Sequence, residues 1–148
     1  MTHSNVTQMS HACHQAQEWI KDLAGRHPFE VEEQAYSYLR AVLHTLRDRL
    51  TMEEAVHFAA HLPTLFRGVF YEGWKPTKVP NKMKSLNEFY QHVEGQFGGG
   101  MQVRTVDVVA ATSAVLAFLE EKVDAGEMRH VKGQLPRELQ GLFTSEAA

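Results

Sequence analysis

The chain has 148 residues, of which 43% are hydrophobic and 22% are charged, as in a folded globular protein. Its formal net charge is −3 and its pI is near 6.3, which excludes the uniformly basic surface of many nucleic-acid-binding proteins. A single cysteine, Cys13, cannot form an internal disulfide. The first residues lack the basic and apolar segments of a secretory signal, and no apolar run reaches the roughly 18 residues that span a bilayer. We therefore expect a cytoplasmic protein of one compact domain, or of two small subdomains that share a core.

The first half of the chain predicts four helices. One covers about residues 7–23 and ends near Gly25, and a second covers about residues 31–50, with apolar residues at helical spacing. Thr51 and Glu54 form a capping-box pattern that begins a short third helix, which ends at Leu62. Pro63 suits the first turn of a fourth helix, which continues through residue 70.

The second half repeats this order after an irregular connection at residues 75–84. Ser85 with Glu88 begins one helix, Asp124 with Glu127 begins another, and Pro136 begins the last. The long helix between them, residues 106–123, is apolar around most of its circumference. We expect this helix at the centre of the fold, with a subunit interface as the alternative.

The two halves match each other in sequence. Residues 41–70 align with residues 114–143 without a gap, and residues 18–25 align with residues 88–95. The extra residues of the second copy fall at Gly98–Gly100, which we interpret as a helix-to-helix loop. The predicted fold is an all-α helical bundle of two pseudo-symmetric tandem repeats, each with two longer and two short helices. Its parts are an N-terminal tail and helix start (1–14), repeat 1 (15–74), a Lys/Pro linker (75–84), repeat 2 (85–143) and a C-terminal tail (144–148).

Four short segments of the sequence resemble a known family. They are AVLHTLRDRL, AAHLPTLFRGVFYEGW, SLNEFYQHV and QLPRELQGLF, and the resemblance runs from about residue 18 to residue 143. In this combination they resemble the bacterial DUF2267 family, a domain of unknown function. The resemblance implies an all-helical fold of paired repeats in bacterial cytoplasmic proteins. It implies no activity and no catalytic residues.

The strongest chemical signal is Glu-x-x-His, which occurs once in each repeat. Residues three apart on a helix share a face. Ferritin-like di-metal proteins use two such pairs and one further glutamate from each of two other helices. The sequence therefore offers a ligand set for iron, manganese or zinc, and His61 could add another nitrogen. The set comprises Glu18, Glu54, His57, Glu88, Glu127 and His130.

The same residues also have a structural interpretation. Glu54, Glu88 and Glu127 each stand three residues after an N-cap residue, where a glutamate caps its own helix. His57 lies off the apolar positions of its helix, so it is expected to face solvent. A separation of His57 and His130 well beyond about 10 Å would exclude a shared two-metal site, in which the ions lie roughly 4 Å apart.

A second candidate site lies around the linker, where aromatic and basic side chains alternate. Such a surface could hold an acidic peptide, an anionic lipid or a nucleic-acid strand. Alternatively, the aromatic side chains pack onto the bundle and the lysines keep an exposed linker in solution. The candidate residues are Phe70, Tyr71, Trp74, Lys75 and Lys78.

Three functions follow from these patterns. The first prediction is a non-enzymatic protein-interaction or oligomerisation module without a cofactor, which binds itself or another bacterial protein. The second is a di-metal carboxylate protein, and the third is nucleic-acid or anionic-ligand binding through the linker. The sequence contains no Gly-x-Ser-x-Gly elbow and no P-loop, and we predict no catalytic residue.

Overall fold

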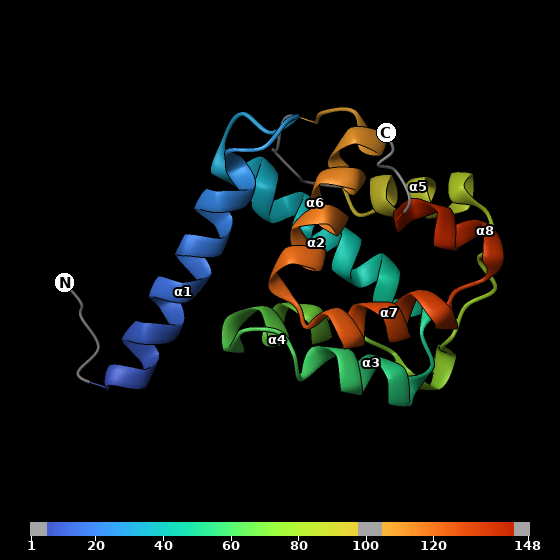
Figure 1. Ribbon diagram of the computed structural model, residues 1–148, viewed down its shortest axis with the longest axis horizontal. Coiled ribbons are helices and arrows are strands. Elements are labelled where there is room, and N and C mark those ends of the chain that lie inside the picture. The colour runs from blue at the N-terminus through green and yellow to red at the C-terminus, as the bar shows by residue number, and fades with distance from the viewer. Residues whose placement is uncertain (1–5, 98–104, 144–148) are drawn as a thin grey trace.

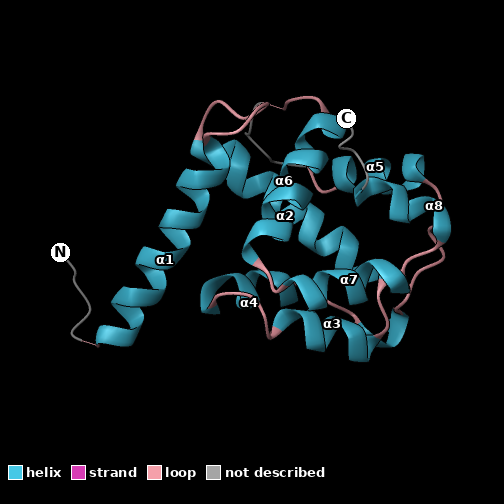
Figure 2. Ribbon diagram, viewed as in Figure 1, coloured by secondary structure: helices cyan, strands magenta, loops and turns pink. Residues whose placement is uncertain are grey.

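The computed structural model describes residues 6–97 and 105–143, and within these ranges the protein is all-α. Figures 1 and 2 show its eight helices and the absence of strands in the described ranges. None of the helices in these ranges has the length and apolar character needed to cross a membrane. The predicted loop at Gly98–Gly100 lies outside the described residues. The helices are α1 (Thr7–Ala24), α2 (Glu32–Arg49), α3 (Met52–Ala59), α4 (Thr64–Tyr71), α5 (Leu86–Gly95), α6 (Val108–Lys122), α7 (Ala125–Gln134) and α8 (Arg137–Gln140), with short 3-10 turns at Pro76–Lys78 and Gly141–Phe143.

The predicted helix starts agree closely with the structure because capping is local. The Thr51 hydroxyl accepts the N–H of Glu54, while the Glu54 carboxylate accepts the N–H of Thr51. Ser85 and Glu88 form the same reciprocal pair at the start of α5. The end of the chain differs from expectation. α8 is a single turn followed by a 3-10 turn, whereas its counterpart α4 has eight residues.

The most enclosed helix is α2, rather than α6. Twelve of the 18 residues of α2 are buried, against six of the 15 residues of α6. α6 does pack against α1, α2, α5 and α7, but Val109 and Ala117 on its outer side are exposed. The core therefore has two central helices, and the polar side chains of α2 do not keep it at the surface.

Buried polar residues of α2 are satisfied by the end of α4. The Arg47 guanidinium donates to the main-chain carbonyls of Phe70 (2.8 Å) and Glu72 (2.7 Å), and the Arg47 side chain is only 5% exposed. His44 Nε2 lies 2.7 Å from the carbonyl oxygen of Val69. The carbonyl of Val69 also accepts the N–H of Glu72, and the side chains of α2 supply further donors to the carbonyls at this helix end, so α2 helps to cap α4.

α1 is attached to the bundle mainly through its C-terminal half. Trp19 stacks on Phe66 and meets Phe118 edge-on, with ring centroids 5.5 and 5.2 Å apart. Near the end of α1, Arg26 pairs with Glu121 (2.8 Å) at the end of α6. Figure 1 shows that the N-terminal part of α1 stands clear of the other helices. The C-terminal half of α1 is therefore fixed to the bundle, whereas its first turn is exposed.

α3 and α7 pack against each other along one edge of the molecule (Figure 1). Each is short and follows one of the two central helices. Their apolar sides are buried through Ala55, Phe58 and Ala59 on α3 and through Met128 and Val131 on α7. We call the line along which they meet the α3–α7 seam.

Candidate metal centre

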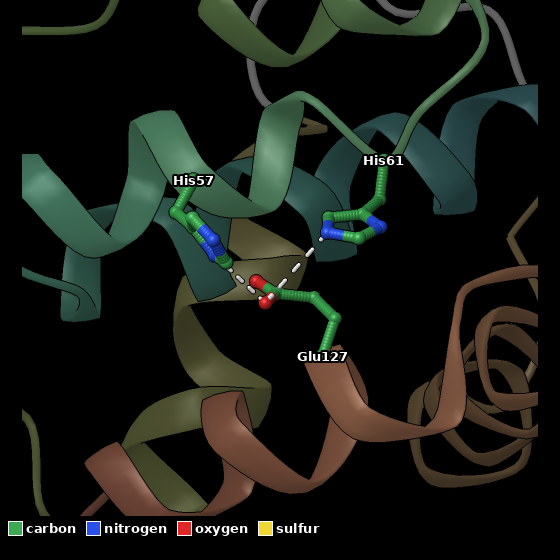
Figure 3. Close-up of side chains that lie close together, drawn as sticks. All are labelled: His57, His61 and Glu127. Atoms are coloured by element: carbon green, nitrogen blue, oxygen red, sulfur yellow. Dashed lines mark ion pairs between the residues drawn. The ribbon is translucent and has the colours of Figure 1, made fainter.

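Three potential metal ligands converge at the α3–α7 seam. Figure 3 shows the Glu127 carboxylate of α7 pointing toward the imidazoles of His57 and His61. The distance from Glu127 Oε1 to His57 Nδ1 is 2.8 Å, and to His61 Nε2 it is 3.8 Å. One ligand atom from each of the three residues lies within 4.8 Å of the other two.

The Glu127 side chain is only 2% exposed, and its second carboxylate oxygen, Oε2, is buried without a hydrogen-bond partner among the described residues. Such a group is unusual, because a buried charge is costly unless its lone pairs are satisfied. A cation is one group that would satisfy this oxygen.

Glu127 does not cap its own helix, contrary to the structural interpretation of the sequence. The Asp124 carboxylate accepts the N–H of Glu127 at 3.1 Å, as an N-cap residue does, but the Glu127 carboxylate makes no return bond to the N–H of Asp124. The Glu127 side chain enters the seam instead. Glu54, its counterpart in the sequence repeat, caps as expected, with its carboxylate on the N–H of Thr51.

The two histidines reach the carboxylate from the same side of α3, one from within the helix and one from just after it. His57 lies in the last turn of α3 and is 63% exposed, in agreement with the expectation that it faces solvent. His61 lies just after the helix, where its N–H donates to the carbonyl of Phe58, and its side chain is 32% exposed. Because they are four residues apart, both imidazoles stay on the same side, with ring centroids 5.7 Å apart.

His130 lies beside this group without belonging to it. Its ring centroid is 6.0 Å from that of His57, so the two histidines of the repeated motif are close enough for a shared site. Both rings line a surface hollow of about 360 Å³, to which Glu54 and Gln134 also contribute. His130 thus lies beside His57 on the exposed side of the seam.

The two remaining predicted ligands lie elsewhere. Glu88 caps α5, where the N–H groups of Lys84 and Ser85 hold the pKa of its carboxyl below the ordinary value. Glu18 is on the exposed side of α1, 3.6 Å from His14. Of the six predicted ligands, the structure therefore brings His57 and Glu127 together and places His130 and Glu54 at the neighbouring hollow. It adds His61 to the first two. The signal for His61 in the sequence was its four-residue spacing from His57.

Two imidazoles and a carboxylate form a ligand set used by catalytic zinc sites, which keep a further coordination position open. Around a tetrahedral zinc ion, bonds of about 2.0–2.2 Å place neighbouring ligand atoms roughly 3.3–3.6 Å apart. The distances of 2.8 and 3.8 Å lie on either side of this range. An ion would replace the proton between His57 and Glu127, and small side-chain rotations would complete the geometry.

The linker residues lie away from the α3–α7 seam. Phe70 is fully buried, and Tyr71 packs between Phe70 and Trp74, with ring centroids 5.5 and 5.3 Å apart. Lys75 and Lys78 are exposed and line a small hollow beside Gly73. Only Tyr71 and Trp74 among the three aromatic residues therefore present part of their surface to a partner.

Comparison with known proteins adds a family to this description. No curated protein was found to match the chain. Residues 16–142 match the model of a family described as an uncharacterized conserved protein, DUF2267. This match covers nearly all of the helical bundle, including both helices of the seam, and the chain therefore belongs to the DUF2267 family.

Proposed function

We propose that this protein binds one divalent transition-metal ion through His57, His61 and Glu127. The supporting observation is the buried carboxylate of Glu127, which faces two imidazoles and has an oxygen without a hydrogen-bond partner. Imidazole and carboxylate ligands suit zinc, iron, manganese and cobalt. The ion would join α3 to α7 and neutralise the buried charge.

A single ion fits the geometry better than the pair of ions predicted from the sequence. A two-metal carboxylate site needs bridging and terminal carboxylates from four helices. Glu54 and Glu88 are engaged as helix caps, and Glu18 is paired with His14 on α1. Glu127 remains the one carboxylate of the predicted set that is buried and only partly satisfied.

The test is metal binding by protein purified without an affinity tag. Calorimetry with Zn²⁺ after EDTA treatment and dialysis should give one equivalent, and Co²⁺ should give a visible absorption band from an ordered nitrogen and oxygen ligand set. Glu127→Gln and His61→Gln should each weaken binding at least tenfold. His92→Gln, an exposed histidine on α5, is the matched control and should bind as the wild type does. Unchanged affinity in Glu127→Gln would refute the proposal.

Protein interaction is the second candidate function, and an exposed apolar groove between α1, α2 and α4 favours it. The groove contains no part of the proposed metal site, so the two functions are separable. We also infer that the bundle arose by duplication of one helical unit. The matching order of a long helix and two shorter ones, in α2–α4 and again in α6–α8, supports this inference.

A further inference from the structure

The groove lies where the attached part of α1 passes α2 and α4. Its volume is about 630 Å³, and its apolar walls come from Ile20 of α1, Tyr36 of α2, and Leu65, Phe66 and Val69 of α4. Tyr36 is 38% exposed and Leu65 is 43% exposed, although most side chains of their size are buried. A contiguous apolar hollow of this kind commonly marks an interaction surface.

α1 extends beyond the groove toward its N-terminus, where Met9 in its first turn is 59% exposed. α1 has 18 residues and is therefore about 27 Å long at 1.5 Å per residue. A segment of two to three helical turns, about 11–16 Å long, is shorter than α1 and could lie along it.

The charged residues that line the groove are both acidic. Glu32 and Glu33, in the first turn of α2, lie at its edge and are exposed. Neither carboxylate has an ion-pair partner among the described residues. The described residues that line the groove include no lysine, arginine or histidine. The site is thus apolar inside and acidic at one edge.

We propose that this groove binds a basic amphipathic helical segment of another protein. The apolar side chains of the segment would fill the space between α1 and α4, and a lysine or arginine would meet Glu32 and Glu33. This is the helix-in-groove mode of recognition, selected by charge. The inference rests on the interaction function named above and specifies its partner class.

The same charges argue against two other occupants. In a symmetric dimer formed through this face, both subunits use the same patch, and its described lining residues offer no basic group to pair with Glu32 and Glu33 of the other copy. An anionic lipid surface would be repelled by the same two glutamates. A cationic segment alone gains from both the apolar walls and the acidic edge.

The experiment uses the full chain and a fluorescein-labelled 14-residue helical peptide of leucine and lysine. A peptide with the same leucine spacing but glutamate in place of lysine is its control. The lysine peptide should bind at least tenfold more tightly than the glutamate peptide by fluorescence anisotropy. Its affinity should fall as salt is raised.

Variants locate the binding. Leu65→Asp should weaken binding of the lysine peptide at least tenfold. Val109→Asp, which changes an equally exposed valine (46%) outside the groove, should leave it unchanged. The double variant Glu32→Gln/Glu33→Gln should weaken binding about fivefold and reduce its salt dependence. Thermal melts confirm that each variant is folded.

The outcomes separate the partner class from the interaction function. If both peptides bind equally and Leu65→Asp weakens both, the groove is a docking site whose partner is not selected by charge. The inference about the partner class then fails, and the proposed interaction function stands. If Leu65→Asp changes binding of neither peptide, the groove is not the docking site, and both proposals fail. Self-association that Leu65→Asp abolishes, measured by sedimentation, would identify a second copy as the occupant and overturn the inference.

Discussion

Replacing Glu127 with methionine should stabilise the metal-free protein. The side chain of Glu127 is 2% exposed, and one of its carboxylate oxygens has no hydrogen-bond partner among the described residues. Methionine has a similar length and no charge, so it removes the desolvation penalty and keeps the seam filled. A residue retained for binding at the expense of stability should behave in this way.

The size of the expected change in the free energy of unfolding follows from two opposing contributions of the Glu127 carboxylate. A buried polar group without a partner costs about 1–3 kcal/mol. The ion pair with His57, whose side chain is 63% exposed, offsets at most about 1 kcal/mol of this cost. The net expectation is that the free energy of unfolding rises by about 1–2 kcal/mol in Glu127→Met. For a chain of this size that corresponds to an increase in Tm of roughly 3–6 °C.

Urea unfolding in EDTA at neutral pH, followed by circular dichroism, measures this change. Added Zn²⁺ at a free concentration of about 100 times Kd should stabilise the wild type by about 2.7 kcal/mol and leave Glu127→Met unchanged. Glu53→Met is the control, because Glu53 is an exposed carboxylate on α3, and it should alter stability by no more than about 0.5 kcal/mol.

Two results would refute this reasoning. If Glu127→Met loses more than about 1 kcal/mol in EDTA, the pair of Glu127 with His57 is a structural ion pair that stabilises the seam. If Zn²⁺ stabilises Glu127→Met as much as the wild type, Glu127 is not a metal ligand.

Three further predictions concern the core and the start of α7. Arg47→Met should lower the free energy of unfolding by about 3 kcal/mol in urea titrations, since the carbonyls at the end of α4 lose their buried donor. Burial lowers the pKa of His44, whose Nε2 faces the carbonyl of Val69, so by NMR its imidazole should titrate below the ordinary value of 6.5. Because the unfolded chain binds this proton at a higher pH than the folded chain does, the contribution of neutral His44 to stability is complete above pH 6.5. It should be lost as the pH falls below that value. Asp124→Thr should weaken Zn²⁺ binding several-fold in calorimetry without changing a ligand, because it lets Glu127 return to capping α7.

The helix starts could be predicted because their determinants are a few residues apart. Thr51 with Glu54 and Ser85 with Glu88 cap their helices as the sequence indicates. The enclosed position of α2 could not be predicted in this way. Arg47 and His44 look like surface residues of an amphipathic helix, and their burial depends on the carbonyls of α4, which the sequence does not place beside them.

The candidate site was predictable only in part for a related reason. The two Glu-x-x-His motifs identified residues that do come together, because α3 and α7 pack against each other. The sequence could not distinguish a glutamate that caps from one that enters the seam, since Glu54 and Glu127 stand at the same position of their helices. The deciding difference is the N-cap residue of each helix.

That difference gives a physical account of why the side chains of Glu54 and Glu127 take different positions. At α3, the neutral Thr51 hydroxyl accepts one N–H and leaves the Thr51 N–H to the carboxylate of Glu54. At α7, the N-cap is Asp124, and a second carboxylate at the same helix start would meet a like charge. Glu127 therefore turns away from its own helix toward His57 and His61. A carboxylate in place of a hydroxyl at one capping position thus accompanies the change of this glutamate from a helix cap to a buried side chain of the seam.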